Sequence, residues 1–234
     1  MTFFGKRFDY HEPIRVDQLV DIDVIVISHD HYDHLDYSSI KALNDNTKHY
    51  LVPLGVGAHL IAWGVDPGKI TELDWGQSAE KLGIQFTATP ARHFSGRGML
   101  NRDKTLWASW VIKGRQKNIY FSGDSGYGPH FKDIGDQYGP FDFAMMECGQ
   151  YNEKWEAIHM MPEQTVQASL DLRSKHTMPI HWGAFDLSLH TWTDPVDRLI
   201  KESESKGVPV STPQLGTRFE IADHPTQSWW KMVP

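Results

Sequence analysis

The sequence predicts a layered α/β fold in a single domain that spans residues 1–234. Short apolar runs typical of buried strands cluster first, and further along the chain they alternate with helical segments. With 234 residues, 40% of them hydrophobic and 23% charged, the chain is long enough to form one sizeable core. A loop rich in histidine and aspartate directly follows the first apolar strand, a usual position for functional residues on such a scaffold.

The expected elements start with a strand at residues 22–28, after an irregular segment over residues 1–20. Because Val24–Ile27 is apolar throughout, both faces of this strand should be covered. A helix over residues 35–43 has Asp36 as its N-cap. The other expected strands are 49–53, 70–73, 84–89, 106–112, 119–122, 141–147, 178–181 and 217–221, and the other helices are 57–63, 162–174 and 195–206.

Composition excludes several classes of function. The formal net charge is −7 without a basic cluster, the opposite of what binding to a nucleic-acid backbone requires. Cys148 is the only cysteine, so no intramolecular disulfide can form, and it is expected to pack as a small buried hydrophobe. No apolar run approaches the roughly 20 residues that span a bilayer, and residues 1–13 lack the apolar run of a signal peptide. We therefore expect a cytoplasmic protein, with peripheral contact at the inner face of the membrane as the alternative.

The stretch Ser28–Asp36, SHDHYDHLD, carries the strongest chemical signal. Imidazole nitrogens and carboxylate oxygens suit zinc and similar first-row divalent ions. His29 and His31 are two residues apart and can point the same way from an extended segment, whereas Asp33 and His34 follow a turn and can face a second ion. The alternative is a solvated polar loop with adventitious metal affinity.

This H-x-H-x-D-H pattern at a strand end resembles the metallo-β-lactamase-fold hydrolases. The later positions of the family's motif fall on His93 in TPARHFSGRG, Asp124 in YFSGDSGYG and His181 in MPIHWGAF. The resemblance implies an αββα sandwich with two divalent ions, zinc being the expected metal. It implies one ion held by His29, His31 and His93, and a second held by Asp33, His34 and His181, with Asp124 bridging both. Taken singly, His93 and His181 also suit structural roles, and Asp124 suits a turn.

A closer resemblance is to the branch that contains N-acyl-phosphatidylethanolamine-hydrolysing phospholipase D. It is carried by SHDHYDHLD, TPARHFSGRG followed by LWASWVI, HMMPEQT and IHWGAFDLSLH, which together extend from His29 to His190. It implies hydrolysis of a phosphodiester by a hydroxide shared between the metals, with Asp33, Asp124 and His159 as catalytic residues. Lactonase or other small-molecule esterase activity is an alternative, and so is a non-catalytic metal-binding remnant.

Other residues have weaker functional interpretations. Arg97 can pair with a substrate phosphate or form an ordinary salt bridge, and an apolar substrate channel is expected from Trp155, Trp182 and His190 unless these rings are core. Trp229 and Trp230 either enter a membrane interface or cap the fold. The expected partners are a phospholipid or small phosphodiester substrate, a membrane surface in peripheral contact, and a second copy in a homodimer.

The region before the metal loop departs from the family pattern. Only 28 residues precede His29, and the Gly-His and Asp-Pro stretches of the family's upstream strands are not found. We therefore expect a first sheet that is incomplete at its N-terminal side. Such a sheet should have an open edge or an exposed apolar patch near the metal loop, and the isolated chain should associate and be less active than a longer one.

Overall fold

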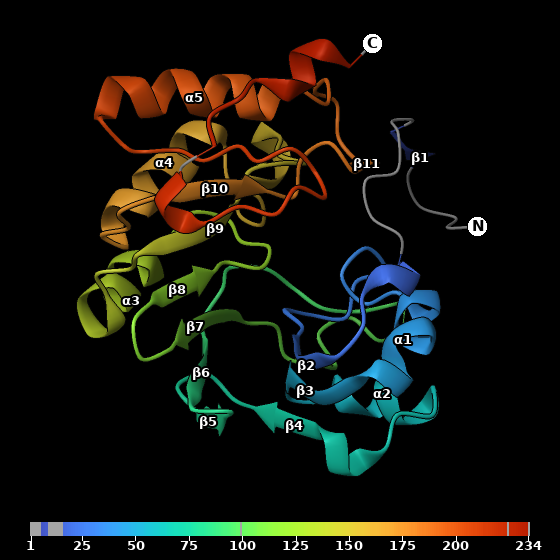
Figure 1. Ribbon diagram of the computed structural model, residues 1–234. Coiled ribbons are helices and arrows are strands. Elements are labelled where there is room, and N and C mark those ends of the chain that lie inside the picture. Colours follow the sequence, from blue (N-terminus) through green and yellow to red (C-terminus); the bar gives the residue numbers. More distant parts are fainter. Residues whose placement is uncertain (1–5, 9–15, 99, 224, 234) are drawn as a thin grey trace.

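The computed structural model has four layers, in which helices flank two sheets that pack face to face. It describes residues 6–8, 16–98, 100–223 and 225–233. In Figure 1 the smaller sheet with α1 and α2 lies at the lower right, and the larger sheet with α3, α4 and α5 lies above it and to the left. This is the αββα sandwich expected from the sequence.

The smaller sheet contains parallel strands in the order β2-β3-β4. The strands are β2 (Ile22–Val26), β3 (Thr47–Pro53) and β4 (Ile70–Leu73). Helices α1 (Tyr37–Leu43) and α2 (Gly57–Ala62) connect them, because parallel neighbours need crossover segments. Ile40 of α1 and Leu60 of α2 pack with Tyr50 on the outer face of this sheet.

The larger sheet has six strands in the order β10-β9-β8-β7-β6-β5. They are β5 (Ser78–Lys81), β6 (Ile84–Thr89), β7 (Ser109–Lys113), β8 (Asn118–Phe121), β9 (Phe143–Glu147) and β10 (Thr177–Ile180). Strands β5 to β8 are antiparallel, whereas β8, β9 and β10 are parallel. The carboxyl ends of these parallel strands therefore reach the same edge of the sheet, a usual place for a functional site.

Three helices cover the outer face of the larger sheet. They are α3 (His130–Tyr138), α4 (Pro162–Asp171) and α5 (Asp194–Lys206). Phe131 and Leu172 belong to the buried cluster under α3 and α4, and Cys148 packs with Val166 and Leu199. Cys148 is thus the small buried hydrophobe that the sequence predicts.

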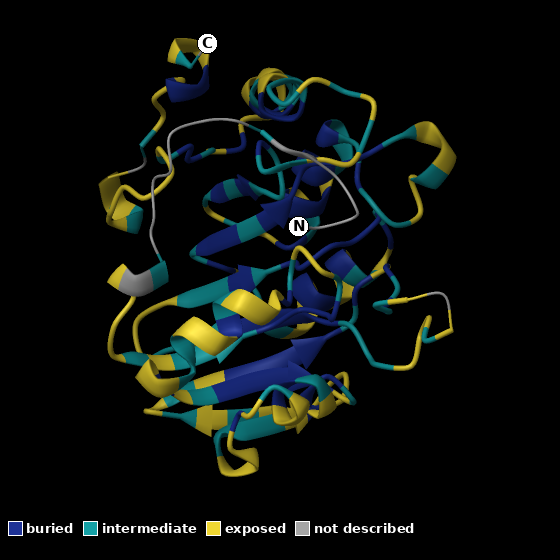
Figure 2. Cartoon of the chain, turned by 90° about the vertical axis from the view of Figure 1, so that its right-hand side faces the viewer, coloured by how far each residue is buried: buried dark blue, intermediate teal, exposed yellow. Residues whose placement is uncertain are grey.

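The core between the sheets is built around Trp110, which is fully buried. It clusters with Leu51 of the smaller sheet and Phe86 of the larger sheet, and its Nε1 donates a hydrogen bond of 3.1 Å to the Ile27 carbonyl. Figure 2 shows the strands as mostly buried and the outer helix surfaces as mostly exposed. Because Ile27 is the last apolar residue before the metal loop, this bond ties the start of the loop to the opposite sheet.

Short elements complete the chain. They are β1 (Lys6–Arg7) paired with β11 (Phe185–Asp186), and 3-10 helices at Val16–Gln18, Asn44–Asn46, Pro67–Lys69, Glu153–Trp155, Ile221–Asp223 and Trp229–Met232. Trp229 and Trp230 are 5% and 1% exposed, and Trp230 donates to the Asp197 carboxylate at 3.0 Å. These tryptophans therefore cap α5 within the fold. Over the described ranges, the helices are too short or too polar to span a bilayer.

Most expected elements are confirmed, and three points differ from expectation. Residues 217–221 do not form the expected strand but lead into a 3-10 helix, and α3 and β5 were not expected from the sequence.

The expectation about Val24–Ile27 is confirmed: Val24 and Val26 pack on the inter-sheet core, and Ile25 and Ile27 pack under the helices. Within the described part of the chain, β2 pairs with β3 on one side only, so it is an edge strand. Most of the segment expected to be irregular, residues 1–5 and 9–15, lies outside the described residues.

The Trp110–Ile27 bond leads to a stability prediction. Trp110→Phe keeps an aromatic ring but leaves the buried Ile27 carbonyl without its donor and creates a small void. We expect the free energy of unfolding to fall by about 2–3 kcal/mol in urea denaturation. Leu189→Ala, at an 83% exposed position, is the control and should change stability by less than about 0.5 kcal/mol. Equal stability of Trp110→Phe and wild type would show that this contact does not hold the sheets together.

Candidate metal centre

All the predicted metal ligands meet at one edge of the two sheets. They come from loops that follow different strands: His29, His31, Asp33 and His34 after β2, His93 after β6, Asp124 after β8 and His181 after β10. Their donor atoms form overlapping groups in which all members lie within 4.8 Å of one another. The geometry therefore gathers residues that are more than 140 positions apart in the chain, as in the His181–Asp33 contact.

The first group consists of His29, His31 and His93. His29 Nε2 lies 2.9 Å from His31 Nδ1, and His93 Nε2 lies 3.2 Å from the same atom. The far nitrogen of His93, Nδ1, lies 3.0 Å from the Ile158 carbonyl, which can only accept a hydrogen bond. His93 Nδ1 must therefore carry the proton, so in the neutral ring the Nε2 lone pair points at the other histidines, as in a metal-ligating imidazole.

Burial keeps this first group uncharged. His29 is 1% exposed and His93 is 8% exposed. Burial is the main cause that lowers the pKa of His29, and it lowers the pKa of His93 to about 3. Neutral imidazoles are the form that binds metal, so these rings are ready to ligate at neutral pH without first losing a proton.

The second group consists of Asp33, His34 and His181. The Asp33 Oδ2 lies 3.5 Å from His34 Nε2 and 3.3 Å from His181 Nε2. Burial alone would raise the pKa of the Asp33 carboxyl. The hydrogen bonds from His181 and His34 outweigh burial and hold this pKa far below its usual value. His181 has a φ of 66°, a left-handed conformation that is uncommon outside glycine and that turns its ring away from the line of β10.

Asp124 lies between the two groups and is almost completely buried. Its Oδ2 is 3.1 Å from His34 Nε2 and 3.3 Å from His181 Nε2, and it is 3.7 Å from His93 Nε2 and 3.9 Å from His29 Nε2. Its Oδ1 is buried without a hydrogen-bond partner. A buried carboxylate oxygen without a donor is costly unless a cation neutralises it, so the donor set fits metal ions.

In the absence of metal, His34 is the group that supplies positive charge to the buried carboxylates. Burial alone would lower its pKa, but the carboxylates of Asp124 and Asp33 outweigh burial and raise the pKa of His34 to about 10. The metal-free chain thus holds an imidazolium where a metal-bound chain would hold a neutral ligand. A proton and a metal ion compete for the same nitrogen.

A cavity of about 310 Å³ opens onto both groups. Its polar wall contains the ligands His31, Asp33, His93, Asp124 and His181, together with Gln150 and His159, and its apolar wall contains Phe94, Trp155, Ile158 and Leu187. His29 and His34 lie behind this wall. The cavity therefore offers a reacting group access to the metal ligands on one side and an apolar surface on the other.

Arg97 does not line this cavity. Its guanidinium donates to the carbonyls of Asp30 and Leu35, both at 2.7 Å, and lies over the Tyr32 ring. Because its donors reach backbone at both ends of the metal loop, Arg97 fixes the shape of that loop instead of facing a substrate phosphate. The Asp30 carboxylate supports the same loop by accepting a 2.7 Å hydrogen bond from the Gly96 amide.

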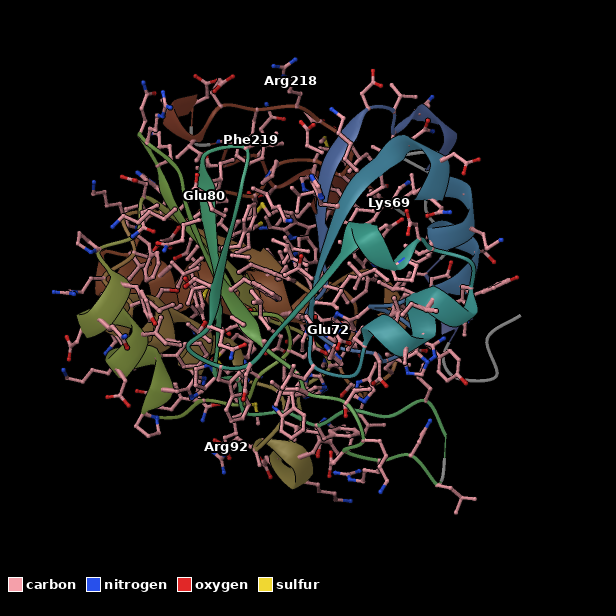
Figure 3. All side chains as sticks on the ribbon, turned by 90° about the horizontal axis from the view of Figure 1, so that it is seen from below. Lys69, Glu72, Glu80, Arg92, Arg218 and Phe219 are labelled. Atoms are coloured by element: carbon pink, nitrogen blue, oxygen red, sulfur yellow. The ribbon has the colours of Figure 1, made fainter. Side chains whose placement is uncertain are left out.

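Of the rings expected to line a substrate channel, only Trp155 borders the metal cavity. Trp182 stacks on Trp192 and borders a second cavity of about 370 Å³, which shares the ligand His181 with the metal cavity and is also formed by residues 178–180, 184, 212–217, 219 and 229. Figure 3 shows Phe219, from that second cavity, on the opposite side of the molecule from Arg92, the neighbour of His93. His190 accepts a hydrogen bond from the Gln150 amide at 2.9 Å and stacks on Tyr151, so it supports the cavity wall from behind.

His159 lies beside the ligands, as expected, and it reveals a residue that the sequence did not single out. Its Nδ1 is 3.0 Å from Oε1 of Glu147, the last residue of β9, and its ring stacks parallel to His181. Glu147 is completely buried. The only signal for it in the sequence is an acidic residue at the end of the apolar run FDFAMME, a pattern that by itself predicts only a strand.

Residues 2–182 match the family model described as "Beta-lactamase superfamily domain". The chain belongs to the beta-lactamase superfamily. Its fold is that of the superfamily's metal-dependent hydrolases. A metallo hydrolase from the archaeon Ignicoccus hospitalis superposes with a TM-score of 0.67 at 23% identity, over 86% of this chain and 81% of that one.

Two curated relatives extend the comparison to sequence. An uncharacterized protein of Mycobacterium tuberculosis is 45% identical over 97% of this chain, which spans 62% of that relative's length. A Caenorhabditis elegans protein named N-acyl-phosphatidylethanolamine-hydrolyzing phospholipase D 1 is 32% identical over 95% of this chain and 67% of its own length.

The raised pKa of His34 leads to a prediction about proton release. Near pH 7 the metal-free protein holds His34 protonated, because this pH lies well below its pKa of about 10. Loading with zinc should therefore release at least about one proton per chain, measured by titration calorimetry in buffers of different ionisation enthalpy. His34→Asn should release about one proton fewer. Zinc binding without proton release would contradict the imidazolium at this position.

Proposed function

We propose that this protein is a two-metal phosphodiesterase that cleaves N-acyl-phosphatidylethanolamine-like phospholipids in the manner of a phospholipase D, with zinc as the metal. The observation that carries the proposal is the pair of ligand groups, His29/His31/His93 and Asp33/His34/His181, joined at Asp124 and open to one cavity. The similarity to the Caenorhabditis elegans phospholipase supports the choice of substrate.

The residues of this chain divide the chemistry between them. A pair of divalent ions, when bound, would lower the pKa of a water they share and attract a phosphoryl oxygen. Asp124 would hold both ions and Asp33 would hold one of them, and both carboxylates would fix where the attacking oxygen lies relative to phosphorus. His159, on the cavity wall, would face the leaving alcohol.

The cavity also suits a substrate with a polar head and an apolar remainder. Phe94, Trp155, Ile158 and Leu187 place hydrocarbon directly beside the ligands. Leu187 is 41% exposed, so apolar surface continues from the cavity wall to its outside. A phosphodiester flanked by acyl chains would bury apolar area there, while its phosphate reaches the polar wall.

The proposal is tested with zinc-loaded protein and vesicles of phosphatidylcholine containing N-palmitoyl-phosphatidylethanolamine. We expect release of N-palmitoylethanolamine and phosphatidate, with the oxygen of isotopically labelled water in the phosphatidate, because attack occurs at phosphorus. Mass spectrometry of both products measures this. Hydrolysis of a lactone or carboxylic ester with no phosphodiester cleavage would contradict the proposal.

Asp124→Asn and His159→Ala should separate the two kinds of catalytic residue. Asp124→Asn removes the charge shared by both ligand groups and should lower kcat by more than about a thousandfold, even at saturating zinc. His159→Ala removes a group that faces substrate and should lower kcat by about a hundredfold. Steady-state kinetics on bis(p-nitrophenyl) phosphate measures the loss of kcat in Asp124→Asn, and steady-state kinetics on an alkyl phosphodiester measures the loss of kcat in His159→Ala. Near-full activity of Asp124→Asn would overturn the assignment of Asp124.

A further inference from the structure

Glu147 is a buried carboxylate for which the predicted metal ligands give no explanation. It ends β9 and is 0% exposed. Its Oε2 accepts a 3.0 Å hydrogen bond from the Met160 amide, and its Oε1 faces His159 Nδ1 at 3.0 Å. Its own amide donates to Ser122 Oγ at 2.8 Å. A charge buried this deeply costs several kcal/mol, which packing alone does not explain.

The position of Glu147 fixes the orientation of the His159 ring. Backbone amides donate to both oxygens of Glu147, as they do to an ionised carboxylate. Such a carboxylate can only accept, so the 3.0 Å contact requires a proton on His159 Nδ1. The opposite nitrogen, Nε2, is then the one available to the metal cavity, which His159 lines. Parallel stacking on His181, with 5.4 Å between ring centroids and 8° between planes, removes the remaining rotational freedom. A carboxylate behind an imidazole is the arrangement that orients catalytic histidines in hydrolases.

We propose that Glu147 is a positioning residue that aims His159 at the leaving-group oxygen, so that His159 donates the proton that the departing alcohol needs. This assignment rests on the phosphodiesterase function proposed above. In the step, hydroxide oxygen forms a bond to phosphorus and the bond from phosphorus to the alkoxy oxygen breaks. His159 enters the step as an imidazolium, protonated on both ring nitrogens, and the alkoxy oxygen keeps the electron pair and takes the Nε2 proton. His159 is left neutral, still donating Nδ1–H to Glu147, and water returns the proton.

A competing interpretation treats the same atoms as a third metal site. Glu147, His159 and His181 have donor atoms within 4.8 Å of one another, and Glu147 Oε1 lies 3.8 Å from His181 Nδ1. The backbone donors favour the positioning role, because the Met160 amide donates to Oε2 at 3.0 Å and the Gly149 amide donates to Oε1 at 3.4 Å. Metal analysis decides between them: a third zinc ion per chain that is lost in Glu147→Gln would overturn the proposal.

The main test uses the dependence of rate on the leaving group. A p-nitrophenolate leaves without help, whereas an alkoxide needs a proton, so a lost proton donor affects only alkyl substrates strongly. We expect Glu147→Gln to lower kcat for an alkyl phosphodiester by about a hundredfold and for its p-nitrophenyl counterpart by less than about threefold, with KM little changed. Glu147→Asp, which retains the charge, should restore part of the alkyl rate. The same substitution at the exposed Glu153, Glu153→Gln, is the matched control and should leave both rates unchanged.

An equal loss for both substrates in Glu147→Gln would overturn the proposal, because it would indicate general damage to the site. Unchanged alkyl and p-nitrophenyl rates would overturn it as well. If Glu147→Gln does not fold, Glu147→Asp must show the same selective loss to a smaller degree. The double variant Glu147→Gln/His159→Ala should be no slower than His159→Ala, because Glu147 acts through His159.

A spectroscopic measurement tests the positioning role of Glu147 independently of the proposed phosphodiesterase activity. In wild-type protein, nuclear magnetic resonance of labelled histidine should show a strongly deshielded His159 Nδ1 proton that disappears in Glu147→Gln. A His159 protonated only at Nε2 would overturn the positioning role, whatever the substrate. Absence of wild-type activity on both phosphodiesters would count against the proposed function, and the resonance would still decide the role of Glu147.

Discussion

The constraint on which this structure depends is the crowding of metal-ligating donor atoms at one sheet edge. His29, His31 and His93 bring ring nitrogens to within 2.9 and 3.2 Å, and Asp124 presents a buried oxygen without a hydrogen-bond partner. Such an arrangement is unfavourable unless cations neutralise it, because lone pairs and carboxylates repel one another in a medium of low dielectric. The surrounding fold must therefore hold these loops together against that repulsion.

Several contacts within the fold supply this restraint. Trp110 joins the larger sheet to the residue that precedes the metal loop, and Arg97 ties both ends of that loop to one guanidinium. Gly123, with a φ of 57°, allows the Asp124 loop to approach Ser28 so closely that a Cβ would lie 2.7 Å from the Ser28 side chain. Rigid support of this kind is what keeps ligands in place before a metal binds.

The sequence predicted the features that depend on local pattern. The apolar run before SHDHYDHLD, the Asp36 cap of α1 and the proline at the start of α4 each have a local physical signature, and each was found. Helix α3 was missed because Gly135 lies in its middle, where it allows close contact with the Asp171 carbonyl, and glycine normally argues against a helix. The strand expected at residues 217–221 had the right residues but no neighbouring strand to pair with in the described structure.

Site residues that act through tertiary contacts were beyond the reach of sequence pattern. Glu147 appears in the sequence as the end of an apolar strand, and only the fold shows that His159 and Met160 surround its carboxylate. Arg97 appears as a free cation, and only the fold shows that backbone carbonyls use its donors. In both cases the charge of the residue was evident, but the partner that determines its role is distant in the chain.

The central claim is that this donor set binds two metal ions, and anomalous diffraction from zinc-soaked crystals at the zinc absorption edge tests it most directly. The account predicts one peak against His29, His31 and His93, a second against Asp33, His34 and His181, and Asp124 in contact with both. A single peak at saturating zinc, or a peak centred elsewhere with either group left empty, would contradict the account.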